Sequence, residues 1–493
     1  MSKYILETDQ RLSRSLLWKL QYEAYCQYGI EAWNQYGVPF YITSNSFTAK
    51  SYAHVVLGYL RDGLANQSID PGHPVYLFDL GAGTGRFAYF FLKELLKFLS
   101  SSSLPKIKLC YVMTDIVRDN FDFWKSHSYL KPYFEKGILD CAYYHHVQDE
   151  PIHLMNSKII VSKETLANPI VLICNYFFDT IPQDLFRYKN GRLEEGCMTL
   201  FVEGEKPADS DPSVINRLQY HYSYQPVSNL KSYYESPEWN ILLESYCQSM
   251  EGNSFLFPVG AFYVLSRFME WSGSRLLLLA GDQGVCTIDQ MKQAGDPKVA
   301  LHGSFSIPVS YHLIAALFRR IDGGAALLTA FSDPSFIVMA GILGEKNEYF
   351  LETSLAFHEH LDSFEPADYL KLVSLTEEQW KECPLDQILL LIKLGNWDAS
   401  VMHTFFSLIR QAIPLADEKQ RQLVRRTIEI VWEHFYPTGP STGDFVLNLG
   451  VLLFEMKFYA EAVIYFERSI KISGVNKKAL NNIVACRQHL QLE

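Results

Sequence analysis

The sequence predicts an α/β fold with a parallel sheet, followed by an all-helical region. Apolar strand-like runs alternate with helical patterns over residues 67–350, and near-continuous apolar strands are typical of a parallel sheet that is covered on both faces. Beyond this region the chain consists of consecutive amphipathic helices. At 493 residues it exceeds what one hydrophobic core usually organises, so more than one domain is expected.

The composition is that of an ordinary globular protein, with 48% hydrophobic and 20% charged residues. A formal net charge of -11 argues against a nucleic-acid partner, because phosphates are neutralised by clustered Lys and Arg. The most apolar tract, residues 323–343, is interrupted by Ser332, Asp333 and Pro334, so we expect two strands around a turn and no membrane span. Nine scattered cysteines, no metal-ligand spacing and no targeting pattern at the N-terminus predict a cytoplasmic protein.

The N-terminal region, residues 1–66, is expected to be helical and to pack on the sheet domain. Apolar and aromatic residues recur at helical spacing from Ile5 to Tyr36, with charges between them. A second helix is expected to begin near Thr48. Turn-forming residues from Asn66 to His73 then lead into the first strand of the sheet.

The sheet domain, residues 67–350, is expected to contain five strands before a closing hairpin. The strands are predicted at Val75–Asp79, Lys108–Thr114, Cys141–Val147, Pro169–Cys174 and Arg275–Ala280. Helices are predicted at Phe87–Leu99, at Arg118–Lys125 and across residues 236–272. The hairpin joins Ala325–Phe331 to Ser335–Leu343 at Asp333-Pro334.

A long insertion, residues 183–273, separates the fourth and fifth strands. Asn190-Gly191 lies between two alternating runs and predicts a two-residue hairpin turn. Insertions at the carboxyl ends of parallel strands lie over the ligand crevice, so this segment is interpreted as a lid or substrate platform.

The C-terminal region, residues 366–493, is predicted to be an all-helical domain. Around residues 447–470 the sequence resembles one tetratricopeptide repeat: Leu449-Gly450 match its L-G pair, Ala462 its small residue and Phe466 the aromatic that follows. Repeats of this kind imply a protein partner. A helical domain without repeat geometry is the alternative.

A glycine loop follows the first expected strand. The stretch V-Y-L-F-D-L-G-A-G-T-G-R-F ends an apolar run in Asp79 and then places Gly81, Gly83 and Gly85 at alternate positions before a helix. Alternating glycines let the backbone turn tightly and let a ligand approach the main chain without meeting Cβ atoms. The loop therefore predicts a ligand site, with a glycine turn that binds nothing as the alternative. The spacing differs from G-x-G-x-x-G, which disfavours a nicotinamide dehydrogenase.

The D-x-G-x-G-x-G pattern resembles motif I of class I S-adenosylmethionine-dependent methyltransferases. The resemblance implies a Rossmann-like seven-stranded sheet and S-adenosyl-L-methionine as cofactor, with Asp79 and the three glycines at the methionine moiety. It also implies that Asp115, which closes the second strand, holds the ribose hydroxyls, although a helix N-cap is nearly as good an interpretation. After the third strand, Gln148 and Asp149 occupy the place of the adenine contact.

The segment after the fourth strand resembles the MidA family of methyltransferases, relatives of the mitochondrial arginine methyltransferase that assists complex I assembly. The stretch V-L-I-C-N-Y-F-F-D-T-I-P matches the family's N-E-F-F-D-A-L-P in Asn175, Phe177, Phe178, Asp179 and Pro182. Weaker matches are F-Y-I-T-S near residue 40, G-D-Q-G at residues 281–284 and H-G-S-F-S-I-P-V-S-Y at residues 302–311.

Two departures from the family bear on the substrate. Tyr176 stands where the family has an acidic residue, and the proline-glutamate of the N-terminal motif is replaced around Asn45 to Phe47. A guanidinium is held by carboxylates, so the loss of two expected acids puts arginine specificity in doubt.

The sequence thus predicts an S-adenosylmethionine-dependent methyltransferase that acts on a protein, with arginine as one candidate, recruited by the helical domain. Asn175 and Asp179 are predicted to be the catalytic residues, facing the methyl group and orienting the acceptor or accepting its proton. The rival hypothesis is a non-catalytic methyltransferase-like scaffold that binds partner proteins. Tyr176 favours the scaffold, whereas the intact glycines and Asp115 favour the enzyme.

Overall fold

The computed structural model describes residues 3–34, 37–104, 106–147, 150–204, 212–329, 335–346, 348–374, 377–380 and 383–492. The chain divides into two compact units, and we describe each by itself. The larger comprises Met1–Thr43, Ser51–Ala88 and Leu92–Ala367, and the smaller comprises Ser44–Lys50, Tyr89–Phe91 and Asp368–Glu493. Among the described residues, no helix has the length and apolar character needed to cross a membrane.

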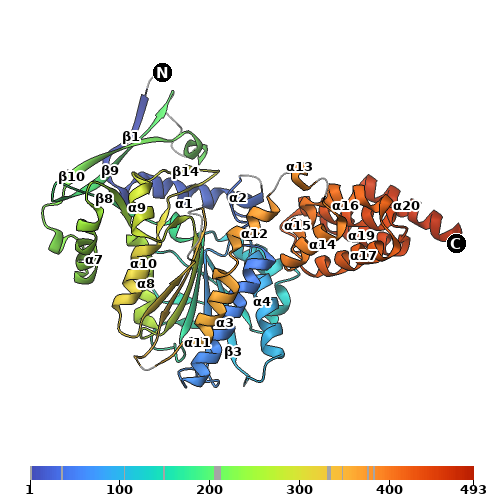
Figure 1. The fold of residues 1–493 in the computed structure, drawn as a ribbon, viewed down its shortest axis with the longest axis horizontal. Helices are drawn as coiled ribbons and strands as arrows, with labels where there is room; N and C mark the ends of the chain where they lie inside the picture. The colour runs from blue at the N-terminus through green and yellow to red at the C-terminus, as the bar shows by residue number, and fades with distance from the viewer. Residues whose placement is uncertain are drawn as a thin grey trace. The chain divides into compact units, whose positions relative to one another are not determined.

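A seven-stranded sheet forms the centre of the larger unit (Figure 1). Its spatial order is β17 (Ala325–Leu328), β18 (Ile337–Leu343), β12 (Leu276–Asp282), β7 (Ile170–Asn175), β2 (Pro74–Leu80), β3 (Lys108–Asp115) and β4 (Leu139–Tyr143). The last five strands of this order are parallel, and β18 is antiparallel to both of its neighbours. The expected parallel sheet with a closing antiparallel pair is therefore confirmed. The predicted turn at Asp333-Pro334 lies outside the described residues.

Helices cover the sheet. The buried cluster on one face joins β2, β7 and β12 to α8 (Val259–Trp271) and α10 (Tyr311–Arg320). Helix α3 (Ser46–Ala65) contacts α4 (Arg86–Ser100) through the rings of Tyr52 and Phe87, whose centroids lie 5.6 Å apart. Further elements are α2 (Glu31–Asn34), α5 (Asp119–Ser126), α6 (Lys131–Glu135), α9 (Ile288–Ala294), α11 (Leu351–Phe357), β5 (Ile152–His153), β6 (Ile160–Val161), β13 (Gly284–Val285), β14 (Ala300–Leu301), β15 (Phe305–Ser306) and β16 (Val309–Ser310).

The insertion forms a second, antiparallel sheet. The predicted hairpin is confirmed: β8 (Asp184–Lys189) and β9 (Arg192–Glu203) pair through Asn190-Gly191, at φ +52° and +72°. The continuous helical pattern predicted across residues 236–272 is wrong in its middle. There β11 (Ser254–Phe257) pairs with β8 between α7 (Pro237–Cys247) and α8, because the edge of β8 offers backbone partners to this buried segment. Strand β10 (Gln219–Pro226) completes the sheet.

The N-terminal prediction also needs correction. Residues Lys3–Arg11 form strand β1, antiparallel to β9, and the first α-helix is α1 (Leu16–Tyr28). The apolar residues form helical structure only from Leu12 onward. The preceding residues are extended because they pair with the open edge of strand β9 in the insertion.

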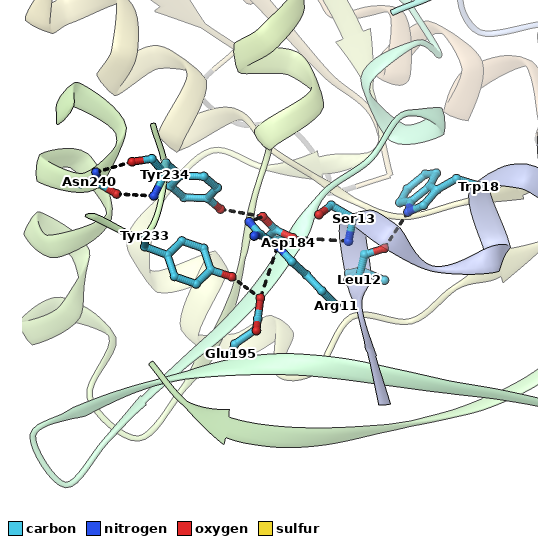
Figure 2. A network of polar contacts seen from close by, with 9 residues as sticks. All are labelled: Arg11, Leu12, Ser13, Trp18, Asp184, Glu195, Tyr233, Tyr234 and Asn240. Carbon is cyan, nitrogen blue, oxygen red and sulfur yellow. Dashed lines mark hydrogen bonds and ion pairs between the residues drawn. The ribbon is translucent and has the colours of Figure 1, made fainter. Parts of the chain in front are cut away.

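Arg11 anchors β1 to the insertion through the polar network in Figure 2. Its guanidinium forms a two-point ion pair with buried Asp184, with Nε 2.8 Å from Oδ1, and lies 3.3 Å from a Glu195 oxygen. The hydroxyl of Tyr234 donates to Asp184 at 2.7 Å, and that of Tyr233 donates to Glu195. Hydrogen bonds from the neighbouring tyrosines thus support a buried ion pair between the two segments.

The smaller unit is helical, as predicted. Its helices are α12 (Pro366–Val373, whose first two residues belong to the larger unit), α13 (Glu377–Trp380), α14 (Leu385–Leu394), α15 (Ala399–Thr404), α16 (Phe406–Ala412), α17 (Glu418–Glu433), α18 (Gly443–Glu455), α19 (Tyr459–Ser473) and α20 (Lys477–Leu492). Helices α18 and α19 approach so closely that a Cβ on Gly450 would lie 2.6 Å from the Phe466 ring. The tetratricopeptide assignment stays a prediction.

Candidate functional site

The glycine loop joins β2 to α4 through three left-handed residues. Gly81, Gly83 and Gly85 have φ angles of +76°, +54° and +73°, a region that L side chains rarely adopt. The N–H groups of Gly81 and Ala82 both donate to the Thr114 carbonyl oxygen, at 3.1 and 2.9 Å. The neighbouring strand β3 therefore fixes the turn, and this backbone explains the glycine pattern.

Asp115, the last residue of β3, binds the loop from the side. Its Oδ2 accepts hydrogen bonds from the Gly83 N–H at 3.2 Å and from Asn120 Nδ2 at 3.0 Å, while Oδ1 accepts from the Val117 N–H at 2.9 Å. Burial raises the pKa of Asp115 to about 6, although these hydrogen bonds favour its charged form. The N-cap of α5 is Arg118, so Asp115 does not have the capping position that was the alternative interpretation.

Asp79 is buried beneath the loop. Its Oδ2 accepts a hydrogen bond from the Tyr111 hydroxyl at 2.8 Å. Burial raises the pKa of Asp79 to about 7; the Tyr111 hydrogen bond opposes this shift and the charge of Asp115 adds to it. The carboxyl of Asp79 therefore keeps its proton to a higher pH than an exposed aspartate does.

Asn175 ends β7 and is followed by a strained residue. The Oδ1 of Asn175 accepts from the Tyr52 hydroxyl at 2.9 Å, whereas its buried Nδ2 has no hydrogen-bond partner among the described residues. Tyr176 has φ +49° and donates its N–H to the Gly281 carbonyl oxygen of β12 at 2.9 Å. A non-glycine residue in this conformation is uncommon, and such strain occurs often at functional sites.

Two carboxyl groups meet where β7 and β12 end. Asp179 lies in the short 3-10 turn Phe178–Thr180, and Asp282 is the last residue of β12. The N–H of Phe178, the residue before Asp179, donates to Asp282 Oδ2 at 3.3 Å. Asp282 Oδ2 also accepts from the Tyr311 hydroxyl at 3.1 Å. Burial raises the pKa of both groups, to about 7 for Asp179 and well above the usual range for Asp282.

Helices α1 and α2 bring aromatic rings to the same edge of the sheet. The Trp33 ring lies 3.0 Å from where a Cβ of Gly83 would be, and the Tyr25 ring stacks on Trp33 with centroids 6.1 Å apart. Gln21 Nε2 of α1 donates to Ser304 Oγ at 3.2 Å and to the Phe305 carbonyl oxygen at 2.7 Å. The N-terminal segment therefore forms a wall beside the glycine loop.

Three histidines of the larger unit, His145, His146 and His302, are partly buried. His302 Nε2 is 3.1 Å from Ser306 Oγ, and burial lowers the pKa of His302. Burial also lowers the pKa of His145, and lowers that of His146 to about 3. The described residues contain no group of three or more His, Cys, Asp or Glu side chains arranged to hold a metal ion.

A pocket of about 460 Å³ lies beside the end of β4. The Arg118 guanidinium lies over the Tyr143 ring at 5.1 Å in its wall. The predicted adenine contacts Gln148 and Asp149 lie outside the described residues. Other lining residues include Ile152, His153 and Lys158.

The structure thus brings Asp79, the glycines and Asp115 together, and places Asn175 at the end of β7 and Asp179 in the turn that follows it. Sequence reasoning did not assign Asp282, Tyr111, Tyr52 or Trp33 to the site. The G-D-Q-G stretch after a strand was a usable signal for Asp282. The others lie in helices or mid-strand, where nothing local distinguishes them from core residues.

No protein-family model matches the chain, and no curated protein sequence matches it. A COG1565 superfamily protein from Burkholderia thailandensis, solved with S-adenosyl-homocysteine bound, aligns at 13% identity and a TM-score of 0.43, covering 72% of this chain and 90% of its own. A native structure of a COG1565 superfamily protein from the same organism aligns at 12% identity and a TM-score of 0.35, covering 68% and 95%. TM-scores below 0.5 do not establish a shared fold.

Proposed function

We propose that the chain is an S-adenosylmethionine-dependent methyltransferase. The observation that carries the proposal is the glycine loop, in which three left-handed glycines follow β2 and Asp115 from β3 accepts the N–H of the central one. This backbone supports the resemblance to motif I. A loop of this kind gives a ligand close access to the main chain.

The charges at this edge fit a cationic ligand. Asp79, Asp115, Asp179 and Asp282 are all buried here, and within the described part of the chain none forms an ion pair with a basic side chain. S-adenosylmethionine carries a sulfonium and an ammonium group, which would offset this negative charge. When bound, it supplies an activated methyl group.

In this proposal each predicted residue has a role. The loop from Gly81 to Gly85 passes beneath the methionine moiety, Asp79 holds its amino group and Asp115 holds the ribose. Asn175 and Asp179 orient the acceptor, and the unpartnered Nδ2 of Asn175 is a hydrogen-bond donor for it. Asp149 remains a proposed adenine contact.

The proposed acceptor is a protein that the C-terminal helices recruit. Arginine is one candidate, because a guanidinium needs carboxylates and both Asp179 and Asp282 lie where β7 and β12 end. Tyr176, in place of an acid, is the observation against it.

Calorimetry with S-adenosylhomocysteine on the full chain tests whether the cofactor binds. We expect binding. If protein that circular dichroism shows to be folded does not bind S-adenosylhomocysteine, the proposed enzymatic function is refuted. Transfer of labelled methyl groups to proteins of a cell lysate, followed by identification of the labelled species, then tests the acceptor.

A non-catalytic scaffold is the second candidate, and two contacts favour it. Both oxygens of Asp115 already accept hydrogen bonds from the protein, and Trp33 covers Gly83. Cofactor binding without methyl transfer to any lysate component would support the scaffold, whereas labelling that is lost in Asp179→Asn would support the enzyme.

A further inference from the structure

The pocket beside the end of β4 is distinct from the residues proposed to bind the cofactor. As far as the structure describes its wall, the wall contains none of Asp79, the three loop glycines or Asp115. It is formed by the end of β4, the residue before α5 and the β5–β6 hairpin. Its volume of about 460 Å³ is typical of pockets that hold small organic molecules.

Two exposed cationic side chains line this pocket. Arg118 follows β3, and Lys158 lies in the turn between β5 and β6. Within the described ranges, neither forms an ion pair. Glu150 is on the same wall, so the two bases exceed the acids by one, in a chain whose formal net charge is -11. A local excess of positive charge on an acidic protein favours an anionic ligand.

The backbone fixes Lys158 in an uncommon conformation. Its φ is +64°, which residues other than glycine rarely adopt. The carboxylate of buried Asp140 holds the turn before it, accepting the N–H groups of Asn156 and Ser157, both at 2.8 Å. The N–H of Lys158 itself donates to the Leu154 carbonyl oxygen at 3.1 Å. The turn is therefore ordered before a ligand arrives, which lowers the conformational cost of binding.

An aromatic ring positions Arg118. Strands β3 and β4 are parallel neighbours with Asp115 opposite Tyr143, so the residues that follow β3 lie beside the end of β4. The Arg118 guanidinium lies over the Tyr143 ring, 5.1 Å from its centroid. This contact uses the face of the guanidinium, so its N–H groups at the edge stay available to an acceptor.

Apolar side chains form much of the remaining wall. Ile152 and Leu154 are buried, whereas Ile160 is 47% exposed. Together with the Tyr143 ring they give the pocket an apolar side next to its two cations. Such a wall suits a ligand that joins a negative group to an apolar or aromatic body, because an inorganic anion would leave the apolar surface uncovered.

We propose that this pocket is a second ligand site, for a small organic anion that carries a phosphate or similar oxyanion on an aromatic or apolar body. Arg118 and Lys158 bind the oxyanion, and Tyr143 and Ile160 contact the body. The proposed cofactor does not account for the two cations, because the adenosine end of S-adenosylmethionine has no negative charge. The second site does not depend on methyl transfer.

Calorimetry of the full chain with phenyl phosphate tests the site, at low ionic strength because salt screens exposed charges. We expect saturable binding, tighter than that of phenol or inorganic phosphate. Arg118→Gln and Lys158→Gln should each weaken it by roughly 10-fold, as for loss of a hydrogen bond to a charged group. The matched control is Lys163→Gln, which removes an exposed lysine that is not in the pocket wall. Both pocket residues are exposed, so circular dichroism should show the variants to be folded.

Weaker binding in both pocket variants, with the control unchanged, supports the proposal. Absence of saturable binding to the wild type, or equal affinities in the pocket variants and the control, overturns it. Inorganic phosphate that binds as tightly as phenyl phosphate also overturns it, because the apolar wall would then contribute nothing.

A titration with saturating S-adenosylhomocysteine separates the pocket from the cofactor site. We expect an unchanged affinity for phenyl phosphate. Competition between the two ligands would assign the pocket to the cofactor and overturn the proposal. If S-adenosylhomocysteine itself does not bind, the proposed function fails, and the phenyl phosphate titrations still decide the second site.

Discussion

The carboxylate of Asp115 accepts a hydrogen bond from the backbone N–H of Gly83 at 3.2 Å, so the acid at the end of β3 and the central glycine of the loop form one structural unit. Removal of the carboxylate would therefore change both the proposed ligand contact and the loop beside it.

Asp115→Ala is expected to weaken binding of S-adenosylhomocysteine by roughly 10- to 100-fold, which corresponds to the loss of about 1.5–3 kcal/mol from hydrogen bonds to a charged group. Isothermal calorimetry measures the effect, with Asp119→Ala, an exposed residue nearby, as the control. An unchanged affinity would remove Asp115 from the site.

Gly83→Ala is expected to destabilise the larger unit more than Gly137→Ala does. Both glycines have positive φ, so each alanine costs about 1–2 kcal/mol of backbone strain. A Cβ on Gly137 meets nothing within 4 Å, whereas one on Gly83 lies 3.0 Å from the Trp33 ring. Urea denaturation gives the difference, and adding Trp33→Ala should relieve only the steric part. Equal losses in the two glycine variants would show that Trp33 does not restrain the loop.

The stability of the larger unit should depend on pH through Asp79. Its pKa is raised to about 7 in the folded state, from an unfolded value near 4, so the folded state binds the proton more tightly. Stability from this group is complete below about pH 4 and is lost as pH rises to about 7. Asp79→Asn mimics the protonated form, so the unfolding free energy of the wild type minus that of the variant should fall across this window. Parallel curves from denaturant titrations at several pH values would contradict the assignment.

Breaking the Arg11–Asp184 pair should destabilise the attachment of β1. Arg11→Met leaves the fully buried Asp184 carboxylate without its cation and is expected to cost about 3–5 kcal/mol. Asp184→Asn is expected to cost less, because the Arg11 side chain is partly exposed and keeps its ion pair with Glu195. The double variant should lose less than the sum. Hydrogen exchange of the β1 and β9 amides reports the local effect, with Lys19→Met in an exposed pair as control. Additive losses would show that the two side chains act independently.

Much of the fold was predictable because its signals are local. The run before Asp79 reads as a buried strand, and Asn190-Gly191 has the positive φ angles that its hairpin needs. Prediction failed where partners distant in the sequence decide the structure. Lys3–Arg11 is extended because β9 pairs with it, and Ser254–Phe257 because β8 does.

The candidate site also has features that follow from local sequence and features that depend on residues distant in the chain. The sequence alone determined the glycine loop, because three left-handed residues at alternate positions strongly favour glycine, and it determined that acids lie at the ends of β2 and β3 and after β7. Only the tertiary structure decided that Asp115 accepts from Gly83, that the Trp33 ring lies against the same glycine and that Asp282 accepts from the Phe178 N–H. These relationships join residues far apart in the chain, and burial, which shifts their pKa values, exists only once the chain has folded.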